Sequence, residues 1–204
     1  IQDDLFFATK ISTGGGRQAG VDQQETSLQD WGRDIIDLNQ VHNLRDTEIH
    51  LRTIRQAKEE GRTRYVGVTT SFGRQYEQME QVLRAEELDF LQVNYSLGER
   101  EAAERLIPLA QDRGMGVIVN EPYNVGRLFG AVSGRDLPDW AAEFDCESWG
   151  QFFLKYILSH PAVTVIIPAT SDPEHLIDNM GAGMGRLPDE QTRTRMEEFF
   201  DGLS

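Results

Sequence analysis

The chain has little cysteine, little lysine and no long apolar run. Cys146 is the one cysteine among 204 residues, which excludes a disulfide framework and a multi-cysteine metal site, so no metal is expected. No apolar stretch approaches the roughly 18 residues of a membrane span, so a membrane partner is not expected. Lys and Arg total 20 against 34 Asp and Glu, a net charge of −14 that argues against a nucleic-acid partner.

What the chain does contain is apolar material for one core. Hydrophobic residues make up 39% of the sequence and recur in dense runs of strand length, which is not typical of a disordered chain. We therefore expect a globular protein with a cytoplasmic location. The chain begins with Ile1 rather than Met, so the presence of a segment or signal before it stays open.

Short β-rich runs alternate with longer amphipathic segments. The predicted strands are residues 5–9, 35–41, 64–69, 89–94, 115–120 and 163–167. The predicted helices are residues 23–32, 46–60, 75–84, 99–113, 148–159, 173–180 and 188–203. Residues 122–145, which hold several glycines, are expected to form a long loop.

This alternation indicates parallel βα units, in an open doubly wound sheet or in a (β/α)₈ barrel. Gly14, Gly15 and Gly16 follow the first predicted strand as a bare run, which we interpret as a flexible loop rather than as a dinucleotide-binding turn that opens a helix. The barrel is favoured. Six strands are predicted where eight close a barrel, so we expect residues 1–204 to be a single, partial TIM-type barrel domain whose first two βα units are missing.

Polar residues stand at the predicted carboxyl ends of these strands, where barrel enzymes place their active sites. Lys10 follows the first strand and His42 the second, and together they are a plausible acid–base pair. A surface lysine and a hydrogen-bonded histidine at a strand end are the structural alternatives. The polar residues that follow the other strands are Thr69, Thr70, Gln92, Asn94, Asn120, Glu121 and Thr170.

Five segments resemble the aldo-keto reductases and follow one another in that family's order. Residues 37–43 (DLNQVHN) are similar to the family's D-L-x-Q-x-H-N strand, and residues 60–68 (EGRTRYVGV) to its E-G-K-I-R-Y-I-G-V segment. Residues 92–96, 113–117 and 167–170 then match in register, and the likeness spans essentially the whole chain.

The resemblance implies a barrel that reduces an aldehyde or ketone, a small-molecule carbonyl substrate, with NADP(H), and with NAD(H) as the other option. In the family's Asp, Tyr, Lys and His set, Lys10 matches the Lys, which lowers the pKa of the Tyr, and His42 matches the His, which polarises the carbonyl. The family's Asp and Tyr precede Lys10 and are not in this chain. Neither Tyr95 nor Tyr123 is expected to replace the tyrosine.

The resemblance also assigns cofactor contacts along the chain. Thr69, Thr70 and Gln92 match carboxamide contacts, and Asn120 stands where many members stack a Tyr on the nicotinamide. The remaining assigned positions are Gly126, Arg127 and Leu128 over the pyrophosphate, Ala169, Thr170 and His175 near the 2′-phosphate, and Asn179 as a nucleotide contact. Ala169 and His175 replace basic residues, so the 2′-phosphate site is the weakest match.

Two other functions stay open. One is a non-catalytic relative that keeps the nucleotide cleft as a binding or regulatory module, and the other is a barrel enzyme that uses Lys10 as a Schiff-base nucleophile. Trp140 is the tryptophan best placed to line a substrate pocket. If 204 residues are the whole protein, unpaired apolar edges on the first and last strands predict poor solubility or an obligate oligomer, and the oligomeric state is otherwise left open.

Overall fold

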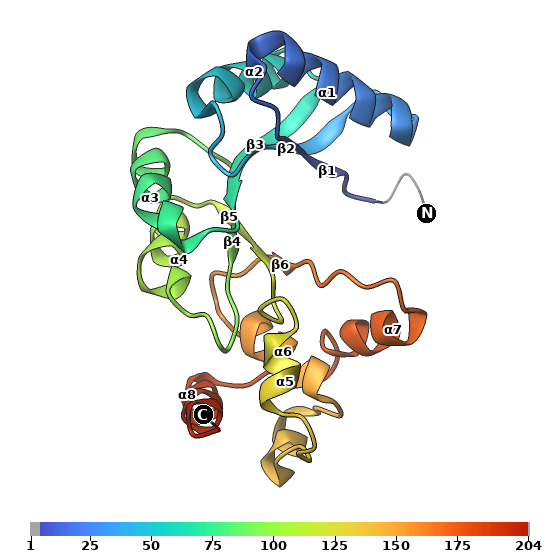
Figure 1. Cartoon of the computed structure of the whole chain (residues 1–204), viewed down its shortest axis with the longest axis vertical. Coiled ribbons are helices and arrows are strands. Elements are labelled where there is room, and N and C mark those ends of the chain that lie inside the picture. Colours follow the sequence, from blue (N-terminus) through green and yellow to red (C-terminus); the bar gives the residue numbers. More distant parts are fainter. Residues whose placement is uncertain (1–4, 204) are drawn as a thin grey trace. The chain divides into compact units, whose positions relative to one another are not determined.

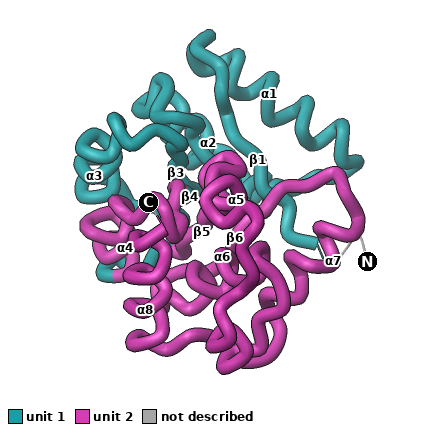
Figure 2. The backbone as a smooth tube through the Cα atoms, turned by 60° about the horizontal axis from the view of Figure 1, so that its bottom comes forward, with its two compact units in different colours: residues 1–92, 112–115 teal, residues 93–111, 116–204 magenta. Residues whose placement is uncertain are grey.

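The computed structural model describes residues 5–203, and the chain divides into two compact units (Figures 1 and 2). Unit 1 comprises Ile1–Gln92 and Asp112–Met115, and unit 2 comprises Val93–Gln111 and Gly116–Ser204. Strands and helices alternate along the chain, and the strand order follows the chain from β1 to β6. This confirms the predicted βα pattern. Whether residues 1–204 act as one domain stays a prediction.

Unit 1 is built on three parallel strands, β1 (Ala8–Ile11), β2 (Ile36–His42) and β3 (Thr63–Thr70). Helices α1 (Gly16–Trp31) and α2 (Thr47–Glu59) connect these strands and lie side by side along them (Figure 1). A short 3₁₀ turn, η2 (Gly73–Gln75), and α3 (Tyr76–Ala85) lead to β4 (Phe90–Asn94), whose first residues belong to this unit.

Local sequence explains why these strands are central. Ile36, Leu38 and Val41 of β2 are buried, as expected for a strand of a parallel sheet that is covered on both faces. Gly67 of β3 permits a close approach, because a Cβ built there would lie 2.6 Å from the carbonyl oxygen of Phe90. Gly61 follows α2 with a φ of +74°, so it ends that helix as the sequence predicts.

Unit 2 contains the remaining elements, with one buried helix at its centre. These elements are α4 (Ala102–Asp112), β5 (Gly116–Asn120), α5 (Arg127–Ala131), the 3₁₀ helix η3 (Asp139–Phe144), α6 (Trp149–Leu158), β6 (Val165–Ile166), α7 (Pro173–Gly181) and α8 (Glu190–Asp201). Strand β6 pairs with β5 in parallel. In α6, Phe152 and Phe153 are buried among other aromatic rings, and Ser148 caps the helix by accepting from the Gln151 N–H.

Three boundary predictions were wrong. The first strand is Ala8–Ile11 rather than residues 5–9, and Leu5 and Phe6 are half exposed, because the ladder to β2 begins only at Ala8. The glycine run does lead into a helix: α1 starts at Gly16, seven residues before the predicted start, on a polar turn with no apolar periodicity. The predicted loop 122–145 contains α5 and η3. Within the part of the chain that is described, no helix is long and apolar enough to cross a bilayer.

Candidate active site

Lys10 and His42 lie on adjacent strands of unit 1 and face the same side of the sheet. Lys10 lies inside β1, not after it, and pairs in register with Gln40 of β2. His42 is two residues beyond Gln40 and ends β2, as predicted. Because side chains alternate between the faces of a strand, Lys10, Gln40 and His42 project from one face. The predicted acid–base pair therefore shares one surface.

Burial shifts the pKa of both titrating groups, and neighbouring positive charges add to the shift of His42. Burial lowers the pKa of the Lys10 ammonium below its ordinary value. Burial also lowers the pKa of His42, and the positive charges of Lys10 and Arg45 lower it further. At neutral pH the imidazole of His42 is consequently neutral, with one ring N–H available to donate and one ring nitrogen to accept.

Gln40 is a site residue that the sequence analysis missed. Its Nε2 donates to Oε1 of Gln92 at 2.9 Å, while its own buried Oε1 has no hydrogen-bond partner among the described residues. Gln92, predicted as a carboxamide contact, is thus oriented by Gln40. The signal was present, since the Gln of the D-L-x-Q-x-H-N strand stands two residues before His42.

The two threonines that end β3 differ in whether their hydroxyl groups are available to a ligand. Thr69 pairs in register with His42 and so projects from the same face. The Thr70 hydroxyl donates to Oε1 of Gln75 at 2.6 Å and accepts from the Phe72 N–H at 3.1 Å. Thr69 therefore remains a candidate contact, whereas the Thr70 hydroxyl is engaged by its own loop.

In unit 2, amide and carboxylate groups gather at the carboxyl ends of β4 and β5. Asn120 donates to Oδ1 of Asn94, and Asn94 donates to Oε2 of Glu121 at 3.1 Å. Burial and the neighbouring Glu121 raise the pKa of Glu99. The buried Oδ1 of Asn120 has no partner among the described residues, so this predicted nicotinamide neighbour offers an unused acceptor.

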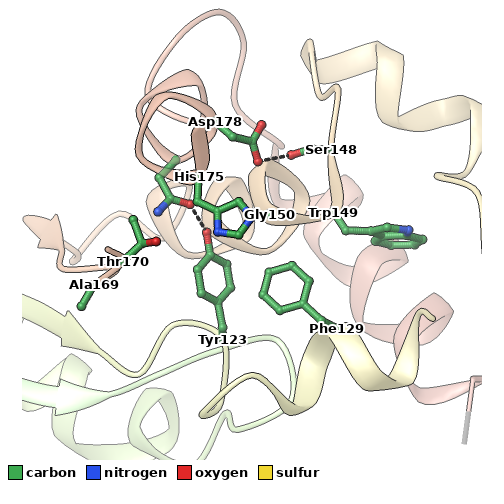
Figure 3. Close-up of a pocket in the computed structure, with 10 residues that line it drawn as sticks. Tyr123, Phe129, Ser148, Trp149, Gly150, Ala169, Thr170, His175 and Asp178 are labelled. Carbon is green, nitrogen blue, oxygen red and sulfur yellow. Dashed lines mark hydrogen bonds between the residues drawn. The ribbon is translucent and has the colours of Figure 1, made fainter. Parts of the chain in front are cut away.

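A pocket of about 500 Å³ opens in unit 2 between α5, α6 and α7 (Figure 3). The Tyr123 hydroxyl donates to Oδ1 of Asn179 across it, and Ser148 donates to Oδ2 of Asp178 at 2.6 Å. Burial and the Asp178 carboxylate raise the pKa of Tyr123, so its phenol stays protonated. A Cβ at Gly150 would lie 2.8 Å from Oδ2 of Asp178, which makes Gly150 necessary for this approach.

The structure gathers four of the predicted cofactor residues in this one pocket: Ala169, Thr170, His175 and Asn179. Gly126, Arg127 and Leu128 do not line it, and the buried Leu128 side chain leaves only its backbone for a ligand. Trp140, expected in a pocket wall, packs instead on Phe144 and Phe152. The wall residues missed are Tyr123, Phe129, Ser148, Trp149, Gly150 and Asp178.

Comparison with known proteins decides the family. The model of the aldo/keto reductase family matches residues 1–197. The chain belongs to the aldo/keto reductase family. An aldo-keto reductase of Strobilurus tenacellus is 24% identical over 228 aligned positions, which span 93% of this chain and 67% of that one.

Solved aldo-keto reductases share the fold. The holo form of a Bacillus halodurans aldo-keto reductase superposes with a TM-score of 0.78 at 21% identity, over 97% of this chain and 72% of that one. A Klebsiella pneumoniae aldo/keto reductase, solved with NADP and acetate, gives a TM-score of 0.79 at 21% identity, over 98% and 71%. The α/β fold thus matches part of the aldo-keto reductase barrel, as the sequence predicts.

Proposed function

We propose that this aldo/keto reductase reduces aldehydes or ketones to alcohols with a nicotinamide dinucleotide, NADP(H) or NAD(H). The observation that carries the proposal is the pocket of unit 2, where four residues assigned to the nucleotide by resemblance form one wall. In unit 1, Lys10 of β1 and His42 of β2 project from one face of the sheet, as a carbonyl-activating pair requires.

The residues present fit such a cofactor. The pocket of about 500 Å³ has aromatic walls and the polar groups of Thr170 and Asn179, which suit a nucleoside. The amide of Gln92 in unit 1 suits a carboxamide, which both donates and accepts. In unit 2, the Oδ1 of Asn120, unpartnered among the described residues, offers a hydrogen-bond acceptor to a nucleotide. When bound, the dinucleotide supplies the hydride that reduces the carbonyl carbon.

The chain's own residues act on the carbonyl oxygen. The neutral His42 donates a ring N–H to the oxygen, where negative charge develops as the carbon is reduced. The Lys10 ammonium stabilises that charge electrostatically. Protonation is assigned by the resemblance to a tyrosine that precedes Lys10 in the family's order, and the Lys10 charge would lower the pKa of that phenol.

The test is cofactor oxidation with a panel of aromatic aldehydes and small ketones, alongside cofactor binding, in a protein whose N-terminus is extended by a segment that carries the family's Asp and Tyr. His42→Leu and Lys10→Met should each lower kcat/KM by about a hundredfold or more, because each removes charge stabilisation at the oxygen. Lys58→Met is the control, since Lys58 pairs with Asp89, which directly precedes the start of β4 rather than following the end of a strand. Cofactor binding without turnover of any carbonyl would overturn the reductase proposal and favour a non-catalytic nucleotide-binding relative.

A further inference from the structure

The nucleotide pocket of unit 2 has almost no positive charge. Of its ten wall residues, His175 alone carries a basic side chain, and Asp178 contributes a carboxylate. The His175 side chain is 73% exposed, and its Nδ1 lies 3.9 Å from Oδ2 of Asp172. Any charge on His175 is therefore screened by water and partly balanced by that carboxylate.

The helix that forms this wall adds negative charge rather than an anion site. Asp172 caps α7 by accepting from the Glu174 N–H at 2.8 Å, and Glu174 lies in the first turn. The Glu174 N–H at this end of α7 is thus already taken by a carboxylate. Asp178, one further turn along, accepts from Ser148 at 2.6 Å and from Gln151 at 2.8 Å.

These groups suit a ribose hydroxyl and not a phosphate. A 2′-phosphate carries up to two negative charges and is bound by Arg or Lys donors, whereas free ribose hydroxyls donate to carboxylate oxygens. Each Asp178 oxygen accepts one hydrogen bond within the protein and keeps capacity for another. We propose that this pocket binds the adenosine of NAD(H) and discriminates against the 2′-phosphate of NADP(H).

This inference rests on the proposed function, since it presumes that the pocket takes the nucleotide. Two wall positions determine the preference for NAD(H) over NADP(H), because neither carries an Arg or Lys side chain that could bind the 2′-phosphate. Ala169 is exposed at the rim and bears no charge, and His175 is a weaker and shorter cation than Arg. A basic side chain at either position would supply the missing donor.

The experiment titrates the 204-residue chain with adenosine 5′-phosphate and with adenosine 2′,5′-bisphosphate, alongside NADH and NADPH, by calorimetry. We expect adenosine 5′-phosphate to bind at least about tenfold more tightly than the bisphosphate, and NADH more tightly than NADPH by a similar factor. Equal or tighter binding of the 2′-phosphorylated ligands overturns the inference and leaves the proposed function standing. If neither the fragments nor the dinucleotides bind, the proposed function fails as well.

Variants of the pocket wall test which residues determine the discrimination against the 2′-phosphate. Ala169→Lys and His175→Arg should each tighten the binding of adenosine 2′,5′-bisphosphate by about tenfold. Each should change the affinity for adenosine 5′-phosphate by less than about twofold. Ala142→Lys is the matched control, because Ala142 is exposed in η3 and lies outside the pocket wall. If the control variant gains as much affinity for adenosine 2′,5′-bisphosphate as the two wall variants, the gain comes from the added positive charge alone, and the assignment of this wall is wrong.

Discussion

At the scale of single residues, burial sets the charge state of the candidate catalytic pair. Both Lys10 and His42 have lowered pKa values, and in each case desolvation is the first cause. Lys10 is in addition a cause of the shift of His42. The two groups are thus coupled electrostatically, and a change at one is measurable at the other.

Lys10→Met should raise the pKa of His42 towards its ordinary value of about 6.5, but not all the way, because burial and Arg45 still oppose the charged form. The measurement is an NMR titration of the His42 ring protons. Lys58→Met should leave the His42 titration unchanged. A His42 pKa that does not move in Lys10→Met would contradict the coupling.

The same shift predicts how stability depends on pH. A histidine with a lowered folded-state pKa binds protons more readily in the unfolded chain, so its contribution to stability is present above about pH 6.5 and is lost as pH falls through the folded-state pKa. Urea unfolding of the wild type and of His42→Gln between about pH 5 and 8 measures this contribution. The stability difference between the two proteins should change over that range, and a constant difference would exclude the effect.

Gly150 controls the shape of the pocket. Gly150→Ala places a Cβ 2.8 Å from Oδ2 of Asp178, so α6 and α7 must separate or Asp178 must leave Ser148. We expect a loss of about 1–3 kcal/mol in stability and at least about tenfold weaker binding of adenosine 5′-phosphate. Gly130→Ala is the control, because nothing lies within 4 Å of a Cβ there. Unchanged binding in Gly150→Ala would mean that the pocket is not the nucleotide site.

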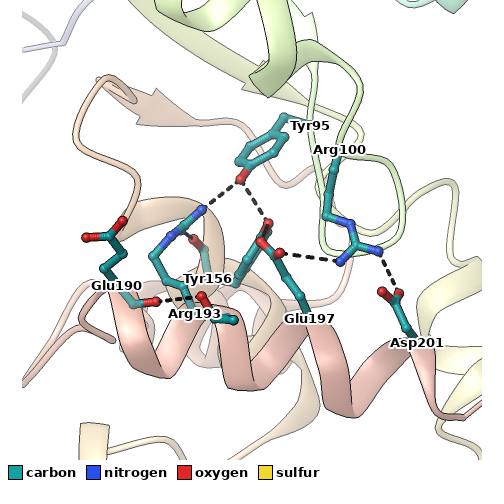
Figure 4. A network of polar contacts seen from close by, with 8 residues as sticks. Tyr95, Arg100, Tyr156, Glu190, Arg193, Glu197 and Asp201 are labelled. Atoms are coloured by element: carbon teal, nitrogen blue, oxygen red, sulfur yellow. Dashed lines mark hydrogen bonds and ion pairs between the residues drawn. The ribbon is translucent and has the colours of Figure 1, made fainter.

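At the scale of elements, α8 is held in unit 2 by a relay of polar side chains (Figure 4). Arg193 of α8 donates to the Tyr95 hydroxyl at 2.8 Å, Tyr95 donates to the Tyr156 hydroxyl at 3.0 Å, and Tyr156 donates to Glu197 of α8. Burial and the neighbouring Tyr95 and Glu197 raise the pKa of Tyr156, so its phenol remains a donor. The relay starts at Arg193 and ends at Glu197 of the same helix, and both tyrosine hydroxyls between them have hydrogen-bond partners.

Arg193→Gln should destabilise the protein by about 2–3 kcal/mol, because it removes charged donors from Tyr95, from the Tyr156 carbonyl and from Ser159. Arg195→Gln on the same helix should cost less than about 1 kcal/mol, since that side chain is half exposed and its Glu143 partner is 3.7 Å away. Urea unfolding and hydrogen exchange of the α8 amides measure the loss of stability in each of the two variants. Equal losses would show that the relay does not hold α8.

At the scale of the whole molecule, net charge and exposed apolar side chains have opposite effects on self-association. The net charge of −14 keeps copies apart. Unit 2 exposes apolar side chains on and just after α7, with Ile177 at 73%, Met180 at 68% and Met184 at 71% exposure. Gathered apolar side chains of this kind favour association. Which property prevails depends on ionic strength.

Self-association should therefore rise with salt. Moving from about 10 mM to about 1 M salt shortens the Debye length from about 30 Å to about 3 Å, which weakens the repulsion but not the apolar attraction. Ile177→Lys should reduce the association in sedimentation experiments. Val125→Lys is the control, as Val125 has a similar exposure of 74% and lies in the turn before α5 rather than on α7. A monomer at both salt concentrations would contradict the prediction.

Local pattern determined the order of the elements and their approximate extent. The ends of β2 and α2 follow directly from apolar runs and from Gly61, which are properties of neighbouring residues. The start of α1 and the helix α5 escaped prediction because their turns are polar or short and carry no periodicity. The family likewise follows from linear motifs, with His42 at the end of its strand.

The pocket and the coupling of site residues depended on tertiary structure. Tyr123 and Asn179 are 56 positions apart, and Ser148 and Asp178 are 30 apart, yet each pair shares a hydrogen bond. Gln40 became a site residue only because its amide meets Gln92, 52 positions away. The sequence by itself determined which side chains end the strands, because that pattern is local. Only the fold decided which distant side chains meet, how deeply Lys10 and His42 are buried, and that the Asp178 carboxylate lines the pocket.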